Sequence, residues 1–75
     1  MNEIYEILDD LGLTVDYKTC TTLVDDAYLE SLDIVMLISE LSDAFDITIP
    51  AREITPENFN SAEAMYDMVM RLQDE

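Results

Sequence analysis

One serine lies where a protein would present a hydroxyl for chemical modification. Ser31 follows Glu30 and precedes Leu32 and Asp33, at the point where an irregular stretch gives way to a helical pattern of apolar residues. Taken alone, this position would make Ser31 an ordinary helix N-cap. A helix N-terminus also favours an attached phosphate, through its unpaired N–H groups and the positive end of its dipole. Ser31 is therefore a candidate for modification by a separate enzyme.

Two apolar residues close to Ser31 favour the interpretation as a presented site. Leu32 and Met36, one helical turn apart, both lie outside the inward-facing row of the predicted helix. An exposed apolar pair beside a modifiable hydroxyl suits a docking surface for partner proteins. Methionine is adaptable enough to contact several different partners.

The sequence lacks the side chains that enzymatic chemistry usually needs. It contains no histidine and a single cysteine, Cys20, so a catalytic triad, a Cys-His pair and a zinc site are all excluded. The single glycine, Gly12, does not fit an EF-hand calcium loop. With 18 acids among 75 residues, adjacent pairs such as Asp9-Asp10 and Asp25-Asp26 are expected by chance. We expect no catalytic residue, no metal site and no enzyme activity.

The charge of the chain restricts its partners. Eighteen acids face three bases, and the formal net charge is −15. Phosphate backbones and anionic membranes would repel such a surface, so neither nucleic-acid binding nor membrane insertion is expected. Partner proteins with basic patches would be attracted over long range. The start Met1-Asn2-Glu3 has no signal-peptide pattern, and no apolar run approaches the ~20 residues of a membrane span. We predict a cytoplasmic monomer.

Helical periodicity identifies the elements that must position Ser31. Apolar residues spaced i, i+3, i+4, i+7 predict a helix over about residues 2–12. Residues 13–30 show no sustained period and predict a long loop, anchored to the core by its apolar residues Leu23, Val24 and Leu29. The clearest helical period then runs from an N-cap at Ser31 to Phe45.

The second half of the chain adds shorter elements. A helical turn is expected around residues 50–55, and Asn60 with Glu63 resembles a capping box for a last helix over about 61–73. The sequence therefore predicts one domain, residues 1–75, with an all-α fold. This fold is a small helical bundle of three main helices plus one short helix, with a long first loop.

The inward-facing rows of these helices predict the hydrophobic core. A hydrophobic fraction of 49% supports a packed interior rather than a disordered chain. Most of the core should consist of Ile4, Ile7, Leu8, Leu11, Leu37, Ile38, Leu41, Phe45, Ile54, Met65 and Val69.

Several segments together resemble the acyl carrier protein family. The resemblance runs from about Ile4 to Leu72, and its signature is the run Glu30-Ser31-Leu32-Asp33. Glu30 stands where the family usually has Asp, and Tyr28-Leu29 stands where a small residue or Gly is common. The other matching segments are Ile34-Val35, Ser39-Glu40-Leu41, Phe45-Asp46-Ile47-Thr48-Ile49-Pro50 and the last helix after Asn58-Phe59-Asn60-Ser61.

The resemblance implies a carrier that catalyses nothing itself. Ser31 would hold a 4′-phosphopantetheine arm, transferred from coenzyme A by a phosphopantetheinyl transferase, and the arm's thiol would hold acyl groups as thioesters. Partners would include this transferase and acyl-loading and acyl-transferring enzymes with basic docking patches. They would read the helix after the serine, through Glu30, Leu32, Asp33, Met36, Ser39, Ser42 and Asp43.

Alternative functions stay open from the sequence. The cargo could be a fatty acyl chain or a polyketide intermediate, as in fatty acid and related lipid metabolism. It could also be an aminoacyl group, as in D-alanyl and peptidyl carriers. A function of a different class is an unmodified acidic interaction module that fills a basic groove on another protein. The charge fits this module, but the module gives no reason for the placement of Ser31 or the exposed Leu32 and Met36.

Overall fold

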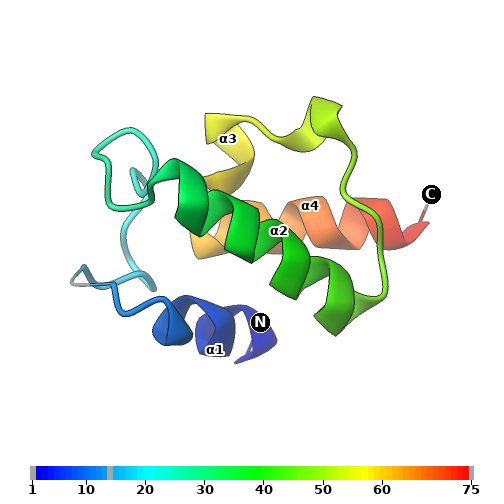
Figure 1. Ribbon diagram of the computed structural model, residues 1–75, viewed down its shortest axis with the longest axis horizontal. Helices are drawn as coiled ribbons and strands as arrows, with labels where there is room; N and C mark the ends of the chain where they lie inside the picture. Colours follow the sequence, from blue (N-terminus) through cyan, green and yellow to red (C-terminus); the bar gives the residue numbers. More distant parts are fainter. Residues whose placement is uncertain (1, 14, 75) are drawn as a thin grey trace.

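The computed structural model describes residues 2–13 and 15–74, and this part of the chain is helical without strands (Figure 1). Met1, Thr14 and Glu75, which belong to the predicted 1–75 domain, lie outside the described residues. The prediction of an all-α bundle is confirmed. Its elements are α1 (Asn2–Asp10), α2 (Ser31–Phe45), the 3₁₀ turn η1 (Ala51–Glu53), the short α3 (Pro56–Phe59) and α4 (Ala62–Asp74).

The three long helices pack against one another around a single core. Helix α2 crosses α4 on one side, and α1 lies beneath both (Figure 1). Short α3 packs against α4. The side chains with no exposed surface come from all three helices and the first loop: Ile4, Leu8, Leu23, Leu37, Leu41, Met65, Met68 and Val69.

The predicted core is right in most of its members and wrong at Ile54. The Ile54 side chain is 42% exposed, because η1 and the turn after it place it on the surface. Phe59, only 1% exposed, contributes the aromatic ring that the prediction missed. A four-residue helix is too short to show a period, so nothing in the sequence separated these two residues. Three other predicted core residues are half-buried and pack against the core: Leu11, Ile38 and Phe45.

Left-handed residues end the first two long helices. Helix α1 ends at Asp10, two residues before the predicted end, and Gly12 follows with φ of +71°. Helix α2 ends where Asp46 takes φ of +53°, and the Ile47 N–H donates to Ser42 O at 3.1 Å. Both are the left-handed caps expected at helix C-termini.

The start of α4 differs from the prediction in its capping residue. Ser61, not Asn60, caps the helix, and its Oγ accepts a hydrogen bond from the Ala64 N–H at 3.0 Å. The predicted pair of Asn60 and Glu63 is wrong, because the Asn60 side chain bonds to the first loop instead. In residues 2–13 and 15–74, no helix combines the length and apolar character that crossing a bilayer requires.

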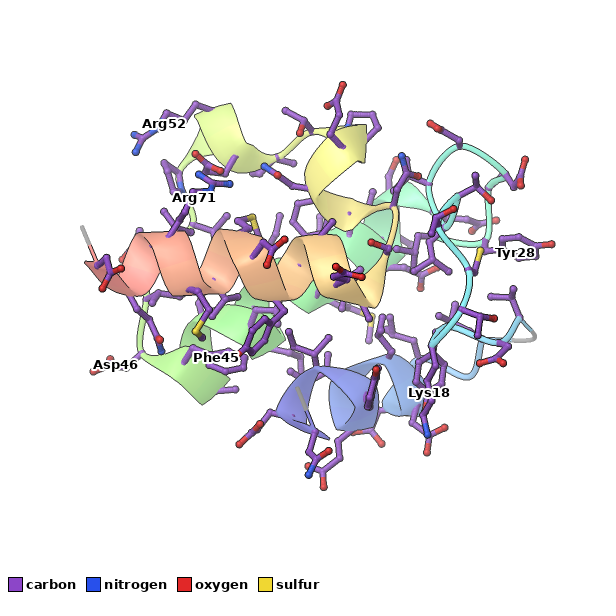
Figure 2. The ribbon with its side chains drawn as sticks, turned by 180° about the vertical axis from the view of Figure 1, so that it is seen from behind. Lys18, Tyr28, Phe45, Asp46, Arg52 and Arg71 are labelled. Carbon is purple, nitrogen blue, oxygen red and sulfur yellow. The ribbon has the colours of Figure 1, made fainter. Side chains whose placement is uncertain are left out.

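A nearly buried carboxylate joins η1 to α4. Glu53 is 8% exposed, and its Oε1 accepts hydrogen bonds from Arg71 at 2.9 Å and from the Asn58 amide at 3.2 Å. Arg52 approaches the other oxygen at 3.6 Å, and both arginines lie above the C-terminal half of α4 in Figure 2. The Arg71 hydrogen bond is the main cause that holds the pKa of Glu53 below its ordinary value. Burial opposes this shift, while the charges of Arg71 and Arg52 add to it.

We predict that Glu53→Gln lowers the free energy of unfolding at pH 7, because Arg71 loses its charged partner. A carboxyl whose folded pKa is lowered stabilises the fold above its unfolded pKa of about 4.5 and stops doing so as pH falls through the folded pKa. The difference between wild type and variant should therefore be constant from pH 7 to 5 and shrink below pH ~4. Urea unfolding across this pH range measures it.

Glu57→Gln is the matched control, since it removes the same charge from an exposed position on α3. Its effect on the unfolding free energy should stay within about 0.5 kcal/mol at every pH. A Glu53→Gln difference that is absent at pH 7, or that persists unchanged at low pH, would contradict the stabilising role of this ion pair.

Candidate functional site

Ser31 is the first residue inside α2, and its neighbours cap the helix. Glu30 is the N-cap, with extended backbone angles, and its carbonyl accepts the Ile34 N–H at 3.0 Å. The Glu30 N–H donates to Asp33 Oδ2 at 3.1 Å. The predicted N-cap role of Ser31 is therefore wrong by one position. Glu30 and Asp33 cap the helix, and the Ser31 hydroxyl takes no part in the capping bonds.

The Ser31 side chain is exposed at the positive end of the helix dipole. Within the described residues, its hydroxyl has no hydrogen-bond partner. The first N–H groups of a helix have no partner inside the helix, and they attract a phosphate oxygen. An exposed hydroxyl beside these N–H groups fits a phosphodiester link to Ser31, because an enzyme can reach it and the local dipole favours the charge.

A closed loop leads into this site. Leu23 and Leu29 are buried, at 0% and 3% exposed, and the Leu29 N–H donates to Leu23 O at 2.8 Å. The expected anchoring of the loop by these leucines is confirmed. Ala27, at the tip, has φ of +62°, and Tyr28 points away from the body of the molecule in Figure 2. The loop therefore has two fixed ends and an exposed tip just before Ser31.

The missed residue at this site is Asn60, from the junction of α3 and α4. Its Oδ1 accepts the N–H groups of Val24 at 2.9 Å and Asp25 at 3.0 Å, and its carbonyl accepts the Leu23 N–H at 2.9 Å. Its Nδ2 donates to Asp25 Oδ2 at 3.2 Å. The sequence indicated a hydrogen-bonding role for the Asn60 side chain. An asparagine before a helix predicts a cap, however, and only the fold shows which N–H groups the side chain meets.

Helix α2 exposes three apolar side chains on one face near its start. Leu32 is 76% exposed, Val35 61% and Met36 50%. Spacings of three and four residues place them side by side on the helix surface. The exposure of Leu32 and Met36 agrees with the sequence pattern. Val35 was missed, although it also lies off the inward row to which Leu37 and Leu41 belong.

The remaining residues expected at the docking face divide into two groups. Ser39 and Asp43 are exposed and continue the strip of Leu32 and Met36 along α2. Ser42 does not join them, because it is half-buried and its hydroxyl donates to Ile38 O at 2.6 Å. A serine in mid-helix often satisfies its hydroxyl on the preceding turn in this way. Glu30 is exposed, and Asp33 is half-buried by its capping contact.

A hollow in the protein surface lies away from Ser31. An open hollow of about 650 Å³ is found at the far end of α2, lined by side chains that include Phe45, Asp46, Ile47 and Arg52. A helix of this length separates it from Ser31 by about 20 Å. Among residues 2–13 and 15–74, no group of three acids or cysteines is arranged to hold a metal ion. The strongest candidate site is thus the exposed Ser31 hydroxyl with the exposed side chains of Leu32, Val35 and Met36 beside it.

Comparison with known proteins gives several relatives. The chain is 45% identical over 64 residues to aminoacyl carrier protein 1 of Bradyrhizobium diazoefficiens. The matched segment covers 85% of this chain and 70% of that protein. It is 31% identical over 75 residues to the D-alanyl carrier protein of Lactococcus lactis subsp. lactis, covering 97% and 95%. It is 43% identical over 47 residues to the acyl carrier protein of Streptococcus pyogenes serotype M1, covering 63% and 64%.

No protein-family model matches the chain, and no solved structure does. The assignment therefore depends on the curated relatives, of which one combines 45% identity with cover of 70% of its own length. The chain belongs to the family of acyl, aminoacyl and D-alanyl carrier proteins, and it is a carrier rather than an enzyme.

Proposed function

We propose that Ser31 carries a 4′-phosphopantetheine arm. In the transfer step, Ser31 Oγ bonds to the phosphorus that bears pantetheine in coenzyme A, and the diphosphate bond breaks. Adenosine 3′,5′-bisphosphate leaves, and a base of the transferase takes the hydroxyl proton. The observation that carries the proposal is the exposed Ser31 hydroxyl, set at the start of α2 while Glu30 and Asp33 make the capping bonds.

The chain's own part is to hold and present the arm. The N–H groups at the start of α2, those of Ser31 and Leu32, would attract the phosphate oxygens. The bound arm supplies a thiol that holds cargo as a thioester. Every other step belongs to partner enzymes, since the chain itself is a carrier. We retain the monomeric state and the single carrier domain over 1–75 as predictions.

Two features support recognition of α2 by partner enzymes. The exposed apolar group of Leu32, Val35 and Met36 lies within the first two helical turns after Ser31. The formal net charge of −15 attracts basic surfaces over long range. We propose that the transferase and the acyl-handling enzymes meet this apolar group in the centre of their contact and the acids of α2 at its rim, as protein interfaces commonly do.

For the cargo, we propose a short aminoacyl group. Relatives named aminoacyl carrier protein and D-alanyl carrier protein match most of the chain. The packing between α2 and α4 supports the same choice, because Leu37, Leu41 and Met65 have no exposed surface. A long acyl chain could enter there only by displacing close-packed side chains, whereas a short polar group needs no interior space.

We predict that coenzyme A and a promiscuous phosphopantetheinyl transferase add one phosphopantetheine to the chain, detected as an intact-mass increase. Ser31→Ala should abolish the increase, because the acceptor oxygen is gone. Ser39→Ala, which removes another exposed hydroxyl of α2, is the matched control and should be modified fully. A wild-type chain that gains no mass, or a Ser31→Ala chain that does, would refute the site. A salt-sensitive complex with a basic protein that survives Ser31→Ala would instead favour the acidic interaction module.

The cargo proposal predicts that acyl chains stay outside the core. The transferase can load alanyl-pantetheine or octanoyl-pantetheine arms from the matching coenzyme A thioesters. The backbone amide shifts of Leu37, Leu41 and Met65 should be the same with either arm, and the octanoyl thioester should hydrolyse as fast as in free octanoyl-pantetheine. Shifted core amides and a protected octanoyl thioester would show that the bundle opens for fatty acyl cargo and would overturn the aminoacyl proposal.

The docking proposal predicts different effects for two neighbouring residues of α2. Met36→Gln should change the free energy of unfolding by less than about 0.5 kcal/mol, since the side chain is 50% exposed and the two residues have similar helix propensities. It should raise the transferase KM by removing an apolar contact. Leu37→Ala, at a fully buried position, should cost about 2–5 kcal/mol. An unchanged KM for Met36→Gln would remove Met36 from the docking face.

A further inference from the structure

Asn60 connects two distant parts of the chain through four hydrogen bonds. Its side-chain oxygen accepts the N–H groups of Val24 and Asp25, and its amide donates to the Asp25 carboxylate. Its backbone carbonyl accepts the Leu23 N–H. The bonded residues are 35 to 37 positions apart, so the α3–α4 junction holds the first loop directly.

The segment that Asn60 holds leads directly to Ser31. Leu23 is bonded in turn to Leu29 through the 2.8 Å contact that closes the loop, and both side chains are buried. Glu30 follows as the N-cap of α2, and Ser31 comes next. A displacement of Leu23–Asp25 is therefore transmitted to Ser31 through the hydrogen bond from Leu29 to Leu23 and then along the backbone of Leu29 and Glu30.

We propose that Asn60 is a positioning residue for Ser31. By fixing Leu23–Asp25, it keeps the loop beside the hydroxyl in one conformation, so that the transferase meets an ordered surface. The inference depends on the proposed function, because it concerns presentation of Ser31 for modification. An enzyme that must first order a mobile loop loses part of its binding energy, and the loss appears in KM.

Asparagine is the side chain that this position requires. Two backbone N–H groups need an acceptor, and the Asp25 carboxylate needs a donor, and a carboxamide supplies both from one group. Aspartate would keep the acceptor but would set a second negative charge 3.2 Å from Asp25 Oδ2. Alanine would supply neither. Asp25 is exposed, so water can replace the lost partners and the core need not unfold.

The test compares transferase kinetics of wild type and Asn60→Ala with coenzyme A. We expect kcat/KM to fall about three- to tenfold, as for the loss of one net hydrogen bond, through a higher KM with unchanged kcat. The final extent of modification should stay complete. Hydrogen exchange of the Val24 and Asp25 amides should accelerate, while the circular dichroism of the helices stays the same.

Asn58→Ala is the matched control. Asn58 is the neighbouring asparagine, and its amide bonds to the Glu53 carbonyl at 2.7 Å and carboxylate at 3.2 Å, away from the first loop. It should lower the melting temperature without changing the transferase KM. If Asn58→Ala raised KM as much as Asn60→Ala does, the effect would follow from general loss of stability, and the positioning role would be refuted.

If Asn60→Ala does not fold, exchanging the carboxamide and the carboxylate between residues 60 and 25 tests the same pairing. Asn60→Asp should raise KM by charge repulsion with Asp25, and the double variant Asn60→Asp with Asp25→Asn should restore it toward the wild-type value. A double variant as poor as Asn60→Asp alone would overturn the proposed pairing. If wild type is modified at Ser31 and Asn60→Ala has the same KM, only the positioning role fails. If wild type is not modified at all, the proposed function fails.

Discussion

The burial of one row of α2 is the constraint on which the rest of the structure depends. Leu37 and Leu41 have no exposed surface and pack in the core with Met65 and Val69 of α4. Because a helix is rigid and its residues repeat every 3.6 positions, fixing this row also fixes the opposite face and both ends. The start of α2 is thereby held at the surface with its N–H groups outward. Leu32 is held in water there, three and four residues before the exposed Val35 and Met36.

The three bases of the chain all make contacts within the fold. Only three bases oppose 18 acids, and each has a described contact. Arg52 and Arg71 pair with Glu53, and Lys18 lies over the ring of Tyr5 at 5.1 Å. The two arginines neutralise the nearly buried carboxylate of Glu53, where an unpaired charge would be costly. The acids of α2 are left unneutralised by them, so the surface beside Ser31 stays attractive to basic proteins.

Local pattern was sufficient for the long helices and insufficient for the contacts between distant segments. The apolar period of α2 identified its buried row, and the absence of a period identified the loop with its two leucine anchors. The errors lie where the outcome depends on a partner far along the chain. Asn60 has the residue type of a cap, but its bonds go to residues 35 to 37 positions away. Ile54 and Phe59 are both apolar residues near short turns, and the fold alone decides which one the core receives.

Among the four serines of the chain, Ser31 is the one whose surroundings favour the proposed modification. Three other serines lie on or beside the helices, and two of them use their hydroxyls within the fold, Ser42 on the Ile38 carbonyl and Ser61 on the Ala64 N–H. Ser39 is exposed, but it lies in mid-helix, where the backbone N–H groups are already bonded. Ser31 alone among these four combines exposure with the unbonded N–H groups of a helix start. This combination exists because Glu30 and Asp33 cap α2. Ser31 lies one residue after the N-cap position, at the first helical position, so its oxygen is available to solvent.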